Sequence, residues 1–358
     1  MKVTTSFSPI STLKAKKSNI FKRQQFLSTK VLIAVFASVY PSVHSLFIPL
    51  LPSHLNTSFI HTVSCTSNNP QTIRSTTPTA TPHLSSNLLK MSLRAWTCHG
   101  RSQRDMVEKL TSAGIIKSAP VKEALLRVDR SNYVENPSNA YMDAPQLIGH
   151  EQTISAPHMH SHALEEIVPT LTKISSSLEQ AQKMEVSGGG SSTTTPAELK
   201  ILDVGCGSGY LTAAFGRIVD RGSQGPVPPL KKGRVWGIDV IPDLVSMSRR
   251  NIMKADSDLL DSGTVTLSVG DGWKGLPNEG PFHAIHVGAA ADDFPVDLLM
   301  QLYPDGGVMV IPVGPVNGIQ NLYRVERLRE SDEFRREDFH FHNLLGVRYV
   351  PLVQSKRP

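Results

Sequence analysis

From about residue 100 onwards, hydrophobic residues recur first with the spacing of amphipathic helices and then in short runs typical of buried strands. Helical spacing predicts two short helices, over 105–113 and 119–128, and a third over 158–168. Beyond residue 199, apolar runs alternate with helical patterns, which is typical of a parallel sheet. The predicted strands are 200–204, 234–240, 265–269, 284–287 and 307–312, with helices at 210–219 and 242–254.

This pattern predicts an α/β protein with a doubly wound, mostly parallel sheet, helices on both faces and a small helical N-terminal subdomain. We expect this domain to span residues 93–353 and to be followed by a short tail, 354–358. Two low-complexity stretches, about 172–199 and 221–233, are predicted to be loop insertions without a site of their own. A third segment, 326–342, is expected to lengthen a loop.

The first 92 residues have the composition of a targeting segment rather than of a packed domain, because they are rich in Ser and Thr and contain no acidic residue. The uncharged stretch 31–51 fits a secretory or organelle presequence. A membrane anchor is a second interpretation, although Pro41 and Pro49 interrupt the apolar run. A third is that translation starts at Met91 and that the upstream sequence is a gene-model extension.

The charge of the chain is distributed unevenly, and this argues against a nucleic-acid-binding protein. The formal net charge is +6, yet the first acidic residue is Asp105, and twelve basic residues precede it. The remaining 25 basic residues accompany 31 acidic ones, so the expected folded part is mildly acidic and has no general attraction to phosphate backbones. The three cysteines form neither a disulfide framework nor a zinc-binding spacing.

A glycine-rich run, LDVGCGSG over 202–209, follows the first predicted strand of the sheet and opens a helix. Glycines there allow a tight turn and let a cofactor approach the backbone at the helix N-terminus. A dinucleotide-binding turn has glycines at the first, third and sixth positions, whereas here Tyr210 occupies the sixth. The run instead resembles the first motif of Rossmann-like S-adenosylmethionine-dependent methyltransferases.

Two carboxylates support a cofactor site at the same edge of the sheet. Asp239 ends the second predicted strand and can accept both ribose hydroxyl protons, and Asp271 follows the third strand between two glycines. Asp271 is placed to reach the exocyclic amine of an adenine. The alternative for Asp271 is an acidic surface turn.

Five motifs together resemble the protein-L-isoaspartate (D-aspartate) O-methyltransferase family, over about residues 96–352. They are TISAPHMH at 153–160, LDVGCGSG at 202–209, VGDG at 269–272, AIHVGAA at 284–290 and VIPVG at 310–314. The resemblance implies the Rossmann-like methyltransferase fold, S-adenosyl-L-methionine as methyl donor, and isoaspartyl-containing peptides and proteins as partners. It also implies a monomeric, cytoplasmic catalytic domain without a stable membrane span, although the leader leaves organelle or secretory routing open.

The resemblance assigns roles to individual residues. Ser155 is the implied active-site residue, and Val350 is implied to lie near the bound peptide. The implied cofactor-binding residues are Thr153, Ile154, Ser155, His160, Asp203, Gly205, Gly207, Ser208, Asp239, Asp271 and Gly272. Gln152 stands where the family more often has a small residue.

The expected reaction needs little acid or base catalysis, because an isoaspartyl α-carboxylate has a pKa of about 4 and is already ionised at neutral pH. We therefore interpret Ser155 as a group that orients the carboxylate and not as a covalent nucleophile. The alternative for Ser155 is an ordinary Ser turn or helix cap before Ala156. His158 and His160 point in different directions at their spacing, so no metal site is expected; His158 and His286 are predicted to be structural.

Two other functions share the same cofactor motifs. One is methylation of a small molecule, and the other is binding of S-adenosylmethionine without turnover.

Overall fold

The computed structural model of the chain describes residues 98–187, 198–220, 230 and 232–354. The predictions for the leader, 1–92, for the Gly- and Pro-rich parts of the two insertions and for residues 355–358 therefore lie outside the described residues. No helix of the described residues is long and apolar enough to cross a membrane.

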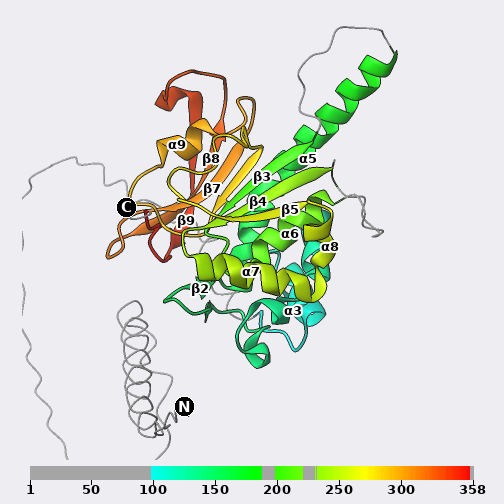
Figure 1. The fold of residues 1–358 in the computed structure, drawn as a ribbon, viewed down its shortest axis with the longest axis vertical. Coiled ribbons are helices and arrows are strands. Elements are labelled where there is room, and N and C mark those ends of the chain that lie inside the picture. The colour runs from blue at the N-terminus through cyan, green and yellow to red at the C-terminus, as the bar shows by residue number, and fades with distance from the viewer. Residues whose placement is uncertain (1–97, 188–197, 221–229, 231, 355–358) are drawn as a thin grey trace, which may run out of the picture. The chain divides into compact units, whose positions relative to one another are not determined.

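A seven-stranded sheet forms the centre of the described region, in the order β5-β4-β3-β6-β7-β8-β9 (Figure 1). Its first five strands are mutually parallel, as the alternation of strands and helices predicts. They are β3 (Leu199–Val204), β4 (Gly233–Asp239), β5 (Val265–Val269), β6 (Ala284–Val287) and β7 (Val308–Val313). Each lies within one residue of its predicted boundaries.

The strand order reverses at β3, since β4 pairs with one side of it and β6 with the other. In open α/β sheets, ligands bind beyond the carboxyl ends of the strands at such a switch point. Parallel pairing brings the ends of β3, β4 and β6, at Val204, Asp239 and Val287, to the same edge of the sheet.

Helices cover both faces of the sheet. Successive residues along each strand point to opposite faces and belong to two different hydrophobic cores. Ile201 and Val235 belong to a core with α4 (Ala119–Arg127), α5 (Pro157–Ser187), α6 (Tyr210–Val219) and α7 (Pro242–Ala255). Leu202 and Trp236 belong to the other core, with α9 (Val296–Met300) and Phe282. The predicted doubly wound fold is confirmed.

A helical N-terminal region precedes the sheet, as predicted. It contains α3 (Gln103–Ser112), whose first turn is capped by the Ser102 side chain accepting a hydrogen bond from the Asp105 amide, then α4 and the short helices η2 (Arg130–Tyr133) and η3 (Pro137–Asn139). The two-stranded hairpin of β1 (Gln146–Leu147) and β2 (Thr153–Ile154) leads into α5.

Two predictions about loops were wrong. Helix α5 continues to Ser187, so residues 172–187 are helical and not part of a loop insertion (Figure 1). Ser and Thr within this stretch were read as loop formers, but Leu171, Ser175 and Leu178 are buried at helical spacing. The prediction for 326–342 is wrong at the two ends of the segment, because 326–327 belong to β8 (Gln320–Arg327) and 339–342 to β9 (Phe339–Val347), which pair as an antiparallel hairpin that extends the sheet; residues 328–335 are loop. Between them lies η4 (Arg336–Asp338).

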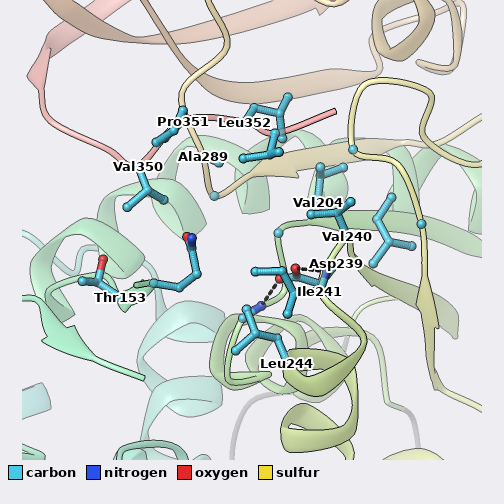
Figure 2. Close-up of a pocket in the computed structure, with 18 of the residues that line it drawn as sticks. Thr153, Val204, Asp239, Val240, Ile241, Leu244, Ala289, Val350, Pro351 and Leu352 are labelled. Carbon is cyan, nitrogen blue, oxygen red and sulfur yellow. Dashed lines mark hydrogen bonds between the residues drawn. The ribbon is translucent and has the colours of Figure 1, made fainter. Parts of the chain in front are cut away.

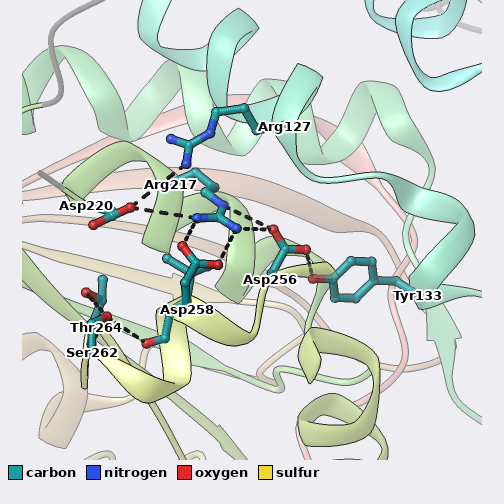
Figure 3. A network of polar contacts seen from close by, with 9 residues as sticks. Arg127, Tyr133, Arg217, Asp220, Asp256, Asp258, Ser262 and Thr264 are labelled. Atoms are coloured by element: carbon teal, nitrogen blue, oxygen red, sulfur yellow. Dashed lines mark hydrogen bonds and ion pairs between the residues drawn. The ribbon is translucent and has the colours of Figure 1, made fainter. Parts of the chain in front are cut away.

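A buried arginine ties helix α6 to the start of α8 (Ser257–Asp261) and to the N-terminal region (Figure 3). The Arg217 guanidinium donates two hydrogen bonds to Asp256, at 2.7 and 3.0 Å, and also binds Asp258. The other Asp256 oxygen accepts the Tyr133 hydroxyl at 2.6 Å. Hydrogen bonds from Arg217 hold the pKa of Asp258 below its usual value.

We predict that Arg217→Met lowers the free energy of unfolding by about 3–5 kcal/mol, because it leaves the buried Asp256 carboxylate without its cation. The matched control is Lys122→Met, which breaks the solvent-exposed Lys122–Glu108 ion pair of 3.0 Å and should cost less than about 1 kcal/mol. Chemical denaturation followed by circular dichroism measures both. Equal losses for the two variants would contradict the structural importance of the Arg217 network.

Candidate active site

A pocket lies beyond the carboxyl ends of β3, β4 and β6 and encloses about 570 Å³, including space open to solvent (Figure 2). The lining comes from the glycine loop, which is residues 205–209 between β3 and α6, and from the ends of β4, β5 and β6. The start of α7, the β1–β2 hairpin and the chain after β9 complete it. Its members are Ile148, Gln152, Thr153, Val204, Gly205, Gly207, Ile238, Asp239, Val240, Ile241, Leu244, Gly270, Gly272, Gly288, Ala289, Val350, Pro351, Leu352 and Val353.

The glycine loop forms the floor of the pocket and has a backbone that other residues rarely adopt. Gly205, Gly207 and Gly209 have φ angles of 74°, 54° and 87°. A Cβ on Gly207 would also lie 3.2 Å from the Ile148 side chain, which packs over the loop. These glycines therefore keep the loop both tightly turned and accessible to a ligand.

Asp239, at the end of β4, joins the glycine loop to the start of α7. Its carboxylate accepts hydrogen bonds from the Gly207 amide at 3.1 Å and from the Ile241 amide at 3.0 Å. Burial raises the pKa of Asp239, and these two backbone hydrogen bonds act in the opposite direction. Because each carboxylate oxygen has two lone pairs, both oxygens can accept a further bond from a diol in the pocket.

The pocket walls beside Asp239 are apolar. Figure 2 shows Ile241 and Leu244 on one side and Ala289 and Val350 across from them. Gly272 allows this close packing, because a Cβ there would lie 2.8 Å from both Val204 and Leu352.

This arrangement fits S-adenosyl-L-methionine. The open backbone of the glycine loop suits the methionine part, the buried Asp239 carboxylate suits the ribose hydroxyls, and the apolar wall at Ile241 and Leu244 suits the flat adenine. Within the described residues, no group of three or more His, Cys, Asp or Glu side chains could hold a metal ion.

The segment that the sequence predicts as the acceptor site, residues 153–160, is called the acceptor segment below. It contributes Thr153 to the pocket lining, and the hairpin turn before it contributes Ile148 and Gln152. Ile154 is buried in the core, and Ser155 follows it, partly buried. Ser155 is not among the lining residues; its side chain lies near the phenol of Tyr349, which precedes the pocket residue Val350.

Tyr349 was not singled out by the sequence analysis as a site residue. Burial raises its pKa to about 12, and the nearby Ser155 side chain acts in the opposite direction. The phenol therefore stays protonated at neutral pH. Its backbone amide donates to the Gln320 side chain at 2.7 Å, which fixes the chain after β9 against the start of β8.

His160 and His158 occupy the first turn of α5 and have different surroundings. His160 is buried against the Tyr210 ring, with 5.2 Å between ring centroids, and burial together with the nearby Arg130 lowers its pKa well below the usual value. The His158 ring lies 2.8 Å from Asp143, a carboxylate with no exposed surface, as expected of a structural histidine.

Three other predicted site residues are absent from the pocket lining. Asp203 is buried beneath the glycine loop, where one oxygen accepts the Thr212 hydroxyl at 2.5 Å and the other contacts His286 at 2.8 Å. Ser208 is buried, and its carbonyl accepts a hydrogen bond from Asn251. Asp271 accepts the Trp273 amide at 3.0 Å and caps the turn beside Gly272.

The structure thus brings Thr153, Gly205, Gly207, Asp239, Gly272 and Val350 into the pocket lining. The apolar wall at Ile241 and Leu244 was missed, although the helix starting at Pro242 was predicted, because an apolar residue beside a helix start reads as core.

Comparison with known proteins agrees with this geometry. The family model described as protein-L-isoaspartate (D-aspartate) O-methyltransferase matches residues 101–197 and 192–357. Protein-L-isoaspartate O-methyltransferase 1 of Arabidopsis thaliana is 38% identical over 252 residues, covering 70% of this chain and 91% of that protein. The Caenorhabditis elegans protein-L-isoaspartate O-methyltransferase is 35% identical over 262 residues, covering 73% and 97%.

Solved structures show the same likeness. A Plasmodium falciparum protein described as a protein-L-isoaspartate O-methyltransferase, in complex with S-adenosyl-L-homocysteine, aligns with a TM-score of 0.55 and 26% identity, covering 72% of this chain and all of that one. A second structure described as a protein-L-isoaspartate O-methyltransferase has a TM-score of 0.50 at 19% identity and shows the fold alone. With the matched family model and these relatives, the chain belongs to the protein-L-isoaspartate (D-aspartate) O-methyltransferase family.

Proposed function

We propose that this protein transfers a methyl group from S-adenosyl-L-methionine to the free α-carboxylate of L-isoaspartyl, and of D-aspartyl, residues in damaged peptides and proteins. The observation that carries the proposal is that the acceptor segment enters the pocket at Thr153, two residues before Ser155, on the pocket that the glycine loop and Asp239 also line. This arrangement would put a carboxylate-binding group next to the cofactor, as a methyl transfer between the two ligands requires.

The chain binds the two reactants and aligns them. Asp239 would hold the ribose, the glycine loop the methionine part and Ile241 with Leu244 the adenine. When bound, S-adenosyl-L-methionine supplies an electrophilic methyl group on its sulfonium sulfur. Holding two reactants in near-attack geometry contributes up to about 7–11 kcal/mol in favourable systems. No general base is needed, because the acceptor carboxylate is already ionised at neutral pH.

Ser155 would donate a hydrogen bond to the acceptor carboxylate and orient one of its oxygens towards the methyl group. Tyr349, protonated at neutral pH, lies near Ser155 and would keep its hydroxyl beside the pocket. Val350 and Thr153 would exclude water on either side. Asp203 and Ser208 are buried beside the glycine loop, so we propose that they support the loop and do not contact the cofactor directly. Ile154, His160, Asp271 and Gly272 would shape the surroundings of the cofactor.

We further propose that the catalytic domain acts as a monomer in the cytoplasm and does not bind nucleic acid. The 31 acidic residues all follow Arg104 and outnumber the 25 basic residues there, which supports the absence of a nucleic-acid partner. Routing by residues 1–92 to an organelle or the secretory pathway is the alternative localisation.

The full-length chain should form labelled methyl ester on an isoaspartyl peptide and none on the peptide of identical sequence that contains normal aspartate. The physical reason is that only the isoaspartyl linkage presents a free α-carboxylate. Release of labelled methanol after mild base treatment measures the ester. Methylation of a small-molecule panel but not of the peptide would favour a small-molecule methyltransferase, and cofactor binding without transfer to either would favour a non-catalytic relative.

Ser155→Ala should reduce kcat/KM for the isoaspartyl peptide by about tenfold or more, because a hydrogen bond to a charged group contributes roughly 1.5–3 kcal/mol. Binding of S-adenosyl-L-homocysteine, measured by calorimetry, should stay within about twofold, since the cofactor contacts lie elsewhere. The matched control is Ser176→Ala, because the Ser176 hydroxyl bonds only to the Thr172 carbonyl of its own helix. Unchanged peptide kinetics in Ser155→Ala would refute the role assigned to this hydroxyl.

Asp239→Asn should weaken S-adenosyl-L-homocysteine binding by about tenfold or more, because an amide replaces one of the two acceptor oxygens that face the ribose. Asp243→Asn serves as control, since Asp243 lies four residues further on with a side chain that is 77% exposed. Calorimetry with both variants measures the effect. Equal affinities of the two variants would contradict the placement of the ribose on Asp239.

A further inference from the structure

Arg130 is a buried arginine that lies against the acceptor segment and has no carboxylate partner. The residue has no exposed surface, and its side-chain contacts among the described residues include no ion pair with an acid. Its Nε is buried without a hydrogen-bond partner. Burial lowers the pKa of the Arg130 guanidinium to about 10, and the charges of Tyr210 and Asp143 act in the opposite direction, so the buried cation is only partly compensated.

Those contacts converge on the proposed active site. One terminal nitrogen of Arg130 donates to the Ser155 carbonyl at 2.7 Å, and the other lies 3.3 Å from Nδ1 of His160. The guanidinium carbon lies 5.2 Å from the centroid of the Tyr210 ring, at the first residue of the helix after the glycine loop. One side chain therefore touches the acceptor segment, the first turn of α5 and the start of α6.

The Arg130 contact determines the state of His160. A guanidinium can only donate, so Nδ1 of His160 must accept and the proton of the neutral ring must lie on Nε2. Burial and the positive charge of Arg130 both lower the pKa of His160, as do the nearby His286 and His158. The ring is therefore neutral at physiological pH.

We propose that Arg130 is a positioning residue for methyl transfer. It fixes the backbone of Ser155 and holds His160 as the Nε2–H tautomer. The acceptor segment therefore keeps one arrangement beside the glycine loop. This inference rests on the proposed function. Arg130 itself does not line the pocket, so it acts through the residues that it holds.

The first experiment uses the full-length wild-type chain and needs no turnover. Long-range ¹H–¹⁵N spectra of the histidine rings, with the His160 signals assigned by their loss in His160→Gln, should show a bare Nδ1 and a protonated Nε2 from pH 6 to 8. A proton on Nδ1, or titration of His160 near pH 6.5, would overturn the proposal even if every Arg130 variant failed to fold.

The second experiment compares Arg130→Lys with Arg217→Lys, two buried arginines of which only the first contacts Ser155 and His160. Arg130→Lys keeps the positive charge but loses the planar guanidinium and its fixed N–H donors. The kcat for the isoaspartyl peptide should therefore fall by about ten- to a hundredfold. The KM for S-adenosyl-L-methionine should change by less than about twofold, and the His160 signals should show both tautomers. Arg217→Lys should lower the melting temperature but leave kcat and the His160 tautomer unchanged.

If Arg130→Lys only lowers the melting temperature and keeps kcat and the tautomer, as Arg217→Lys is expected to do, Arg130 is merely structural and the proposal is wrong. Failure of the proposed function is distinguishable, because the wild-type chain would then methylate no isoaspartyl peptide, whatever the tautomer of His160.

Discussion

The two hydrogen bonds that the Asp239 carboxylate accepts from the amides of Gly207 and Ile241 are the interaction on which the pocket depends. They join the loop after β3 to the loop after β4, and parallel pairing of these strands brings the two loops together. A carboxylate oxygen that accepts a backbone amide keeps a second lone pair, so the same group can organise the loops and bind a ligand. The sheet edge therefore carries a preformed pocket, where we propose that the cofactor binds.

The acceptor side is built differently, from segments that lie far apart in the chain. Ser155 comes from the N-terminal region, Tyr349 from the chain after the last strand, and Arg130 from a short helix that precedes both. In the proposed arrangement the sheet edge would hold the cofactor and the N-terminal region would supply the acceptor side of the pocket. The Arg217 network connects α6 to this region through Asp256 and Tyr133.

Much of this architecture follows from local patterns, which explains what could be predicted. The parallel strands and helix α6 were predicted within one residue because apolar runs, glycine turns and helix starts are local signals. Thr153, the glycines and Asp239 were found because motifs place them at strand ends. The β8–β9 hairpin and the long α5 were missed, since pairing with β7 and burial of Leu178 depend on distant partners. Tyr349 and Arg130 were missed for the same reason: only the fold brings them to Ser155.

The most direct test of the account is a crystal structure of the protein with S-adenosyl-L-homocysteine and an isoaspartyl peptide. We expect the ribose hydroxyls on Asp239 and one oxygen of the peptide α-carboxylate within about 3 Å of the Ser155 hydroxyl, facing the cofactor sulfur. A cofactor bound away from the glycine loop, or a peptide carboxylate held by groups other than Ser155, would contradict the account.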